Sequence, residues 1–163
     1  IAVEAGSTEC TDGLMKIVEH ATKTGSPQGS MFLFDGAGSN DYNRTSAAGQ
    51  VEFLRGAVST PWGEALHASM PVAGVDGSLA GFGVGTSAEG KIQAKTGSRI
   101  VGYPAVGSLF YAAQSYSGYM TTESGRELAF SVIFNATSAG SIDEALEIMN
   151  DVGGVALALQ AHG

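Results

Sequence analysis

Hydrophobic side chains recur every three or four positions near the start of the chain, which is the period of an amphipathic helix. This pattern predicts a helix over residues 11–24, begun by Ser7 or Thr11 and ended by Gly25. The apolar face of this helix consists of Leu14, Ile17, Val18 and Ala21.

Two more helices are predicted before the middle of the chain. Ser46 has the side chain of an N-cap, and the apolar positions of residues 47–58 again follow helical spacing. Pro61 suits the first turn of a short helix that continues to Met70, where Pro71 stops it.

Strand patterns differ between the two halves of the chain. A compact apolar run at residues 31–34 predicts a buried strand, which leads into a turn-rich loop at residues 35–43. In the second half, apolar and polar residues alternate with the period of a strand. The strands predicted there cover residues 91–98, 117–121 and 128–135, with a hairpin turn at residues 123–126.

Glycine-rich stretches and a final helix complete the pattern. Residues 72–90 form a glycine-rich connection, and residues 99–116 are an unusual stretch with further glycine and proline breaks and many aromatic residues. Ser141 and Glu144 form a capping box that opens a closing helix, which the glycine pair 153–154 ends or kinks. This order of elements predicts an α+β fold with an antiparallel sheet flanked by helices.

The composition is that of a folded protein with a net charge of −8 at pH 7. Its 163 residues suffice for one domain with a hydrophobic core. Lys and Arg form no cluster, so nucleic acid is not expected as a partner. Cys10 is the only cysteine and is predicted to be a small buried residue. The three histidines have no metal-ligand spacing, no cofactor or metal is expected, and no apolar run is long enough to span a membrane.

Lys95-Thr96-Gly97 lies at the end of a predicted strand. Lys-Thr-Gly is one of three motifs that form the serine acyl-transfer site of penicillin-binding proteins and class A β-lactamases. Lys-Thr-Gly-Ser occurs twice, at residues 23–26 and 95–98. The first copy ends a predicted helix and precedes Pro27, so only the second has the strand context that the chemistry needs. The other two motifs, Ser-x-x-Lys and Ser-x-Asn, do not occur in this sequence.

Four blocks of residues resemble the C-terminal part of the D-alanyl-D-alanine carboxypeptidases among the class C penicillin-binding proteins, the dacB-like S13 peptidase family. The blocks occur in the family's order and cover roughly residues 30–135. They are Asp35–Gly38 with Asn43–Ala47; Met70–Leu79; Gly90–Lys91 with Ala94–Ser98; and Ser117–Tyr119 with Thr121–Thr122, Gly125–Arg126 and Ala129–Phe130.

This resemblance implies a β-lactamase/transpeptidase-like fold, of which residues 1–163 are the C-terminal part. It implies that Ser-x-x-Lys and Ser-x-Asn lie upstream, in an N-terminal companion segment. The implied function is that of a serine D-Ala-D-Ala carboxypeptidase or endopeptidase, which cleaves peptidoglycan stem peptides through an acyl-enzyme and is inhibited by β-lactams. Such an enzyme works outside the cytoplasm, in the periplasm or cell envelope.

The resemblance also assigns roles to residues of the second Lys-Thr-Gly-Ser copy. Lys95 would help to relay protons and attract the C-terminal carboxylate of the substrate, which the hydroxyls of Thr96 and Ser98 would also bind. The backbone N–H of Ser98 would stabilise the oxyanion, and Gly97 would leave room for the substrate backbone. Lys95 and Ser98 are therefore the expected catalytic residues. Strand alternation puts Thr96 and Ser98 on one side, so Lys95 must reach the site through twist or from a strand edge.

Several alternatives remain open at this point. Ser39-Asn40-Asp41 resembles Ser-x-Asn out of register and is interpreted as a turn, while Asp35 and Asp76 are interpreted as structural. Residues 99–116 are longer than the family pattern and would lengthen the hairpin beside the site, which leaves the substrate open. A non-catalytic binding module that keeps the carboxylate pocket, and an esterase on the same fold, are the rival functions.

Overall fold

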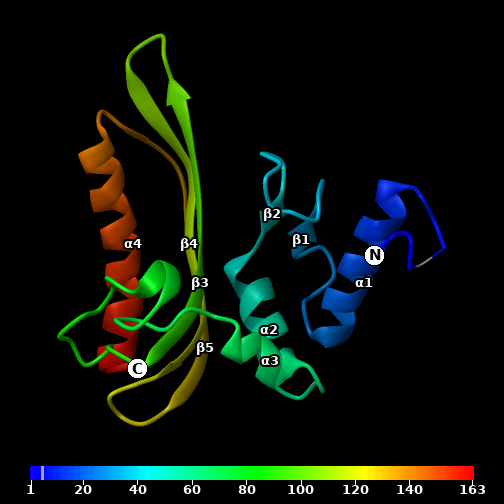
Figure 1. The fold of residues 1–163 in the computed structure, drawn as a ribbon, viewed down its shortest axis with the longest axis horizontal. Coiled ribbons are helices and arrows are strands. Elements are labelled where there is room, and N and C mark those ends of the chain that lie inside the picture. The colour runs from blue at the N-terminus through cyan, green and yellow to red at the C-terminus, as the bar shows by residue number, and fades with distance from the viewer. Residues whose placement is uncertain (5) are drawn as a thin grey trace. The chain divides into compact units, whose positions relative to one another are not determined.

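Two units make up the computed structural model, which describes residues 1–4 and 6–163 (Figure 1). The first unit covers Ile1–Glu64 and the second covers Ala65–Gly163. Helix α3 (Gly63–Ala68) contains the boundary between them. The second unit contains the long strands and the copy of Lys-Thr-Gly-Ser at residues 95–98.

Helices and a short two-stranded sheet form the first unit. Its elements are α1 (Cys10–Thr24), β1 (Met31–Phe32), β2 (Arg44–Thr45) and α2 (Ala47–Ala57). Gly25 ends α1 as predicted, with a φ of 133°, and its N–H donates to the carbonyl oxygens of Ala21 and Thr22. A Cβ on Gly56 would lie 1.5 Å from the carbonyl oxygen of Thr24, so α2 meets the end of α1 only because this residue is glycine.

The predicted N-caps of the first two helices have different outcomes. Neither Ser7 nor Thr11 caps α1, whose N-cap position is occupied by Glu9 without a side-chain hydrogen bond. The hydroxyl of Ser7 instead accepts the N–H of Glu9 in a local turn. Ser46 caps α2 as predicted, because its Oγ accepts the N–H of Gly49 at 3.0 Å.

Two burial predictions for the first unit are wrong. The run at residues 31–34 forms a strand only at Met31–Phe32, and the side chains of Phe32 and Phe34 are 63% and 56% exposed. In the described part of the chain, β1 pairs only with the two-residue strand β2, which is too short to build a buried sheet. Cys10 is exposed at the start of α1.

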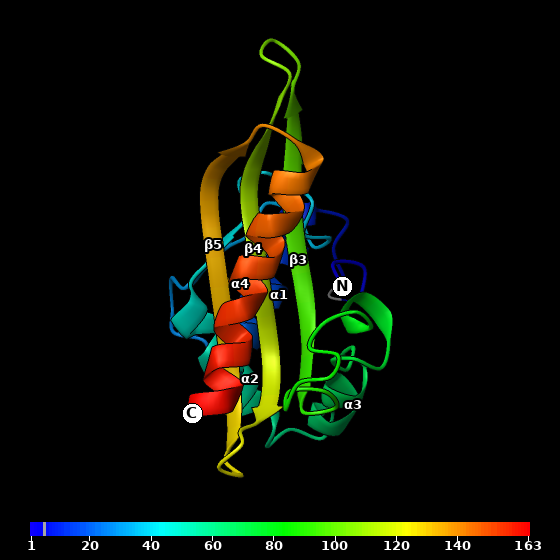
Figure 2. The same ribbon diagram turned by 90° about the vertical axis from the view of Figure 1, so that its left-hand side faces the viewer.

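A three-stranded antiparallel sheet with a long helix along one face forms most of the second unit (Figures 1 and 2). The elements are η1 (Gly77–Leu79), β3 (Ile92–Tyr103), β4 (Ser108–Thr121), β5 (Glu127–Ala139) and α4 (Ile142–His162), with strand order β3-β4-β5. Ser141 caps α4 by accepting the N–H of Glu144, as predicted. The predicted α+β fold is confirmed.

The strands β3 and β4 form one long hairpin that includes residues 99–116, a stretch for which no strand was predicted. β3 continues to Tyr103, and β4 begins at Ser108 after a short turn. Cross-strand pairs run from Ile92 opposite Met120 to the end of the hairpin, with one register shift. This continuous ladder of backbone hydrogen bonds outweighs the local strand-breaking tendency of the glycine and proline residues.

The two faces of the sheet have different surroundings. α4 crosses the three strands on one face (Figure 2). The core between them is built from buried residues of sheet, helix and preceding loop, including Leu79, Ile92, Ala94, Tyr116, Met120, Phe130, Val152 and Ala156. Thr96 and Ser98 follow Ala94 by two and four positions and therefore lie on this same face. Lys95 and Gly97 lie on the opposite face.

α4 does not end at the glycine pair 153–154 but continues to His162. Gly153 is buried, and a Cβ on it would lie 2.7 Å from Cε2 of Phe82. Gly154 has no such neighbour, since nothing lies within 4 Å of its Cβ position. Gly153 therefore lets the helix approach the core closely.

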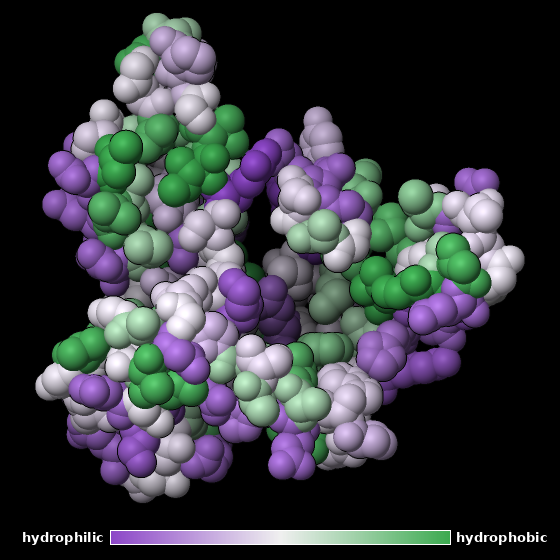
Figure 3. Space-filling view, in the orientation of Figure 1, coloured by the Kyte–Doolittle hydropathy of each residue, from purple (hydrophilic) through white to green (hydrophobic). Residues whose placement is uncertain are grey.

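Apolar side chains gather on the upper part of the second unit, over the start of α4 and the neighbouring strands (Figure 3). Those exposed in this region are Ile100, Val101, Tyr103, Val106, Phe110, Phe134, Ile142 and Leu146. The described residues include no helix that combines the length and the hydropathy needed to cross a bilayer.

Candidate active site

The outer edge of β3 is paired only at its beginning. The N–H of Ala94 donates to the carbonyl oxygen of Pro71 at 3.0 Å, and the N–H of Ala73 donates to that of Ile92 at 2.9 Å. Within the residues that the structure describes, no strand pairs with this edge beyond Ala94. The edge is therefore open where the Lys-Thr-Gly-Ser sequence begins.

Backbone groups of this sequence point to the open edge. Along a strand, the N–H and C=O groups of successive residues alternate between its two edges. Since Ala94 uses the outer edge, Thr96 and Ser98 present their backbone groups to it as well, whereas Lys95 and Gly97 pair with β4. The N–H of Ser98 thus has the direction that an oxyanion donor at this edge needs.

Lys95 reaches the same edge. Its side chain leaves β3 on the face opposite α4, yet its Nζ donates to the carbonyl oxygen of Thr96 at 2.7 Å. No carboxylate of the described chain forms an ion pair with Lys95, and no three His, Cys, Asp or Glu side chains there are placed to hold a metal ion. The ammonium group of Lys95 is therefore a positive charge at the open edge.

Thr96 is tied to a residue that the sequence did not single out. Its Oγ1 donates to Oγ of Ser78 at 3.0 Å, and Ser78 belongs to η1. The loop that carries η1 is held by Asp76, whose Oδ1 accepts the N–H of Val72 at 2.8 Å. Ser78 lies within one of the four family blocks, but only the fold reveals its contact across 18 residues.

Ser98 is tied to a second unforeseen residue, Gln114. The Oγ of Ser98 donates to Oε1 of Gln114 at 2.5 Å on the face covered by α4. The hydroxyls of both Thr96 and Ser98 therefore make internal hydrogen bonds, while the Lys95 ammonium and the Ser98 N–H point to the edge. Gln114 was missed because no strand was predicted for its segment. Its two-residue spacing from Tyr116, the strand period, was the available signal.

Gly97 faces small polar side chains across the sheet. It lies opposite Ser115, and a Cβ on Gly97 would come within 2.8 Å of that serine's Oγ. On the same face, the hydroxyls of Ser117 and Ser131 are hydrogen-bonded to each other at 2.9 Å. On the face opposite α4, the side chains around Gly97 are therefore small and polar.

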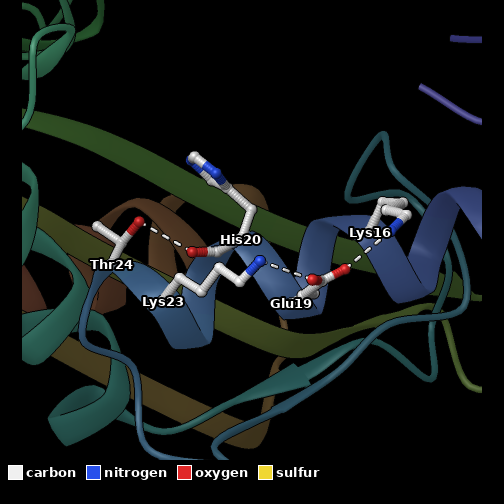
Figure 4. Close-up of polar contacts among 5 residues, drawn as sticks. All are labelled: Lys16, Glu19, His20, Lys23 and Thr24. Atoms are coloured by element: carbon white, nitrogen blue, oxygen red, sulfur yellow. Dashed lines mark hydrogen bonds and ion pairs between the residues drawn. The ribbon is translucent and has the colours of Figure 1, made fainter. Parts of the chain in front are cut away.

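The first Lys-Thr-Gly-Ser copy is part of a helix terminus, as predicted (Figure 4). Lys23 Nζ donates to Oε1 of Glu19 at 2.7 Å, and Lys16 Nζ lies 3.0 Å from the other carboxylate oxygen. The hydrogen bonds and charges of these two lysines lower the pKa of Glu19 from 4.5 to about 2, and the hydrogen bond from Lys23 has the largest effect. Thr24 Oγ1 donates to the carbonyl oxygen of His20. The side chains of Lys23 and Thr24 are thus engaged within α1, while Oγ of Ser26 donates to the carbonyl oxygen of Gly49 in α2 at 2.9 Å.

Asp35 organises the loop that contains the decoy Ser39-Asn40-Asp41. Its carboxylate accepts the backbone N–H groups of residues 37–40 and the side-chain amide of Asn43. The bond from Asn43, aided by the backbone bonds, lowers the pKa of Asp35. Because every one of these partners belongs to the loop itself, Asp35 acts as a structural residue, and the decoy is part of the turn that it closes.

Comparison with known proteins identifies the family. The model of the family described as "D-Ala-D-Ala carboxypeptidase 3 (S13) family" matches residues 2–154. The chain belongs to the S13 family. The resemblance read from its four sequence blocks is therefore confirmed.

One relative and two solved structures are similar to this chain. A D-alanyl-D-alanine carboxypeptidase of Actinomadura sp. (strain R39) is 34% identical over 139 residues, which are 82% of this chain and 24% of that protein. Penicillin-binding protein 4 (dacB) of Haemophilus influenzae matches in fold, with a TM-score of 0.72, 23% identity, and coverage of 93% of this chain and 32% of its own. Its complex with a β-lactam gives a TM-score of 0.73 at 21% identity, with 94% and 34% covered. The chain thus spans about a quarter of its curated relative's length.

Proposed function

We propose that the whole protein is a serine D-Ala-D-Ala carboxypeptidase or endopeptidase, to which this chain contributes the Lys-Thr-Gly strand. The observation that carries the proposal is the open edge of β3 in a member of the S13 family. At this edge the Lys95 ammonium and the Ser98 N–H lie within four residues of each other.

An open antiparallel edge suits an extended peptide, because the substrate backbone adds to the sheet as a further strand. The substrate would be a peptidoglycan stem peptide ending in D-Ala-D-Ala. Lys95 supplies a positive charge for its C-terminal carboxylate, and the Thr96 hydroxyl is close to the same edge. Gly97 has no side chain and so leaves room for the substrate backbone. The N–H of Ser98 binds the oxygen of the reacting carbonyl.

The proposed reaction has two steps and needs a serine nucleophile from the part of the protein upstream of this chain, within a Ser-x-x-Lys segment. Its Oγ attacks the carbonyl carbon between the two D-alanines and forms an ester. The C–N bond breaks, and the terminal D-alanine leaves with the proton that the serine lost. Water then attacks the ester, which releases the shortened peptide and returns a proton to the serine. Ser98 N–H stabilises the oxyanion in both steps, and Lys95 relays protons.

β-Lactams would inhibit the enzyme, because they carry a carboxylate and a reactive amide like those of the peptide end. Peptidoglycan as the substrate places the protein outside the cytoplasm, in the periplasm or cell envelope. The rival functions are a binding module without a nucleophile and an esterase on the same fold.

The test uses the full-length protein with two matched substrates, an acylated peptide ending in D-Ala-D-Ala and its ester analogue ending in D-Ala-D-lactate. Release of D-alanine from the peptide, with a covalent penicillin adduct detected by intact mass, supports the carboxypeptidase. Release of lactate alone supports the esterase. Neither product and no adduct would support the binding module and refute the proposal.

A further inference from the structure

Gln114 is a fully buried polar residue directly behind the Lys-Thr-Gly-Ser sequence. Its side chain is 0% exposed on the face of the sheet covered by α4. Its Oε1 accepts two hydroxyl groups, that of Ser98 at 2.5 Å and that of Tyr111 at 2.8 Å. Its Nε2 is buried and has no hydrogen-bond partner in the described part of the chain.

Stability alone does not account for this residue. A buried amide donor that lacks a partner destabilises the folded protein, because it loses its hydrogen bonds to water and gains none in return. The surroundings are mostly apolar, since Tyr111 packs with Ala139 and Ala145 beside it. A methionine would fill a similar volume without the unpaired donor, so the retained amide points to a task that an apolar side chain does not perform.

That task is found at Ser98. A serine hydroxyl has a single proton, and in this structure the proton is directed to Gln114. While this bond lasts, Ser98 cannot donate its hydroxyl to a substrate carboxylate. The bond instead fixes the Ser98 side chain against the covered face, and the same residue turns its N–H to the open edge.

We propose that Gln114 is a positioning residue for acyl transfer, which anchors the side chain of Ser98 and thereby holds the Ser98 N–H in place for the oxyanion. This inference rests on the proposed function. It also predicts that the Ser98 hydroxyl serves the anchor and not the recognition of the substrate carboxylate. Loss of the anchor therefore slows the chemical step and leaves substrate binding unchanged.

The test compares full-length variants that cut the network at different points. Gln114→Met removes both hydrogen bonds and keeps the volume, whereas Tyr111→Phe removes one bond to the same oxygen and leaves the bond from Ser98. For each variant the measurements are the β-lactam acylation rate, kcat and KM for a peptide ending in D-Ala-D-Ala, and Tm. Gln114→Met is expected to lower the acylation rate and kcat about tenfold with KM within about twofold, because small displacements of a reacting group cost up to about 10²-fold. Tyr111→Phe is expected to lower Tm with an acylation rate within about twofold of the wild type.

Ser98→Ala removes the other partner of the Ser98–Gln114 hydrogen bond, and it replaces Gln114→Met as the test variant if Gln114→Met does not fold. It is expected to lower kcat without raising KM. The double variant is expected to be no slower than Ser98→Ala alone, since both changes remove the same Ser98–Gln114 bond.

Four results would overturn the inference. These are an unchanged acylation rate in Gln114→Met, an equal loss in Tyr111→Phe that follows Tm, additive effects in the double variant, or a raised KM in Ser98→Ala. A wild-type protein that forms no penicillin adduct and releases no D-alanine would overturn the proposed function and this inference together. Labelling of the wild type with an unchanged Gln114→Met rate overturns the inference alone.

Discussion

Replacing Gly118 by alanine should disturb the strand that carries the candidate site. Gly118 lies on β4 directly opposite Ala94, the residue before Lys95. A Cβ at this position would lie 2.1 Å from the carbonyl oxygen of Gln93, and 2.6 Å and 2.9 Å from Cα and Cβ of Ala94. Relief of the shortest contact to an ordinary 3.4 Å requires a movement of about 1.3 Å. Because two of these atoms are backbone, β3 itself must shift.

The size of the effect follows from that movement. Overpacking a well-packed site costs about 1–3 kcal/mol, and we expect the upper part of this range because backbone must move. For a unit of the size of Ala65–Gly163, such a loss lowers Tm by about 4–8 °C per kcal/mol. A displacement of about 1 Å next to Lys95 should also slow β-lactam acylation by up to about 10²-fold.

Gly102→Ala is the matched control for Gly118→Ala. Gly102 lies in β3, has no atom within 4 Å of its Cβ position and does not have a positive φ. Alanine there should leave acylation unchanged and raise stability by about 0.4–1 kcal/mol through the unfolded state. The assay is Tm by calorimetry and acylation by intact mass, both on the full-length protein. Equal Tm and acylation for the two variants would refute the close approach of β3 and β4 at Gly118.

Three further predictions concern α4, α1 and the Asp35 loop. Gly154→Ala should stabilise α4 by up to about 1 kcal/mol. The new methyl group in Gly153→Ala meets a core side chain, so in denaturant unfolding this variant should be at least about 1 kcal/mol less stable than Gly154→Ala. In an NMR titration, the carboxyl group of Glu19 should titrate near its lowered pKa of about 2. Its contribution to stability is therefore present above about pH 4.5, the pKa of the unfolded chain, and is lost as the pH falls toward 2. Lys23→Met should move the midpoint of this titration to higher pH. Asp35→Ala should speed hydrogen exchange of the four loop amides that its carboxylate accepts, and unchanged exchange would contradict the structural role.

Local chemistry made several elements of this fold predictable. Gly25 ends α1, Ser46 caps α2 and Ser141 caps α4, as their side chains and spacing indicated. Each of these signals acts within four residues and so can be read directly from the chain. The same local context separated the helical copy of Lys-Thr-Gly-Ser from the copy on β3.

Contacts between distant residues could not be read in the same way. The hairpin through residues 99–116, where no strand was predicted, is decided by pairing across β3 and β4, whereas glycine and proline signal only local preference. The bonds of Thr96 to Ser78 and of Ser98 to Gln114 span 18 and 16 residues. Phe32 and Phe34 were predicted to be buried but are exposed, because an apolar run does not show whether a second layer of structure covers it.

The most direct test of the account compares β-lactam acylation of the full-length protein in two lysine variants, Lys95→Met and Lys23→Met, by time-resolved intact mass. Both lysines begin a Lys-Thr-Gly-Ser sequence, but only Lys95 lies at the open edge of β3. We predict one covalent adduct on the wild type, an unchanged rate in Lys23→Met, and a rate at least about 10²-fold lower in Lys95→Met, a loss of the size seen when one preorganised charge-stabilising group is removed. Acylation of Lys95→Met at the wild-type rate would contradict the assignment of this edge as the active site.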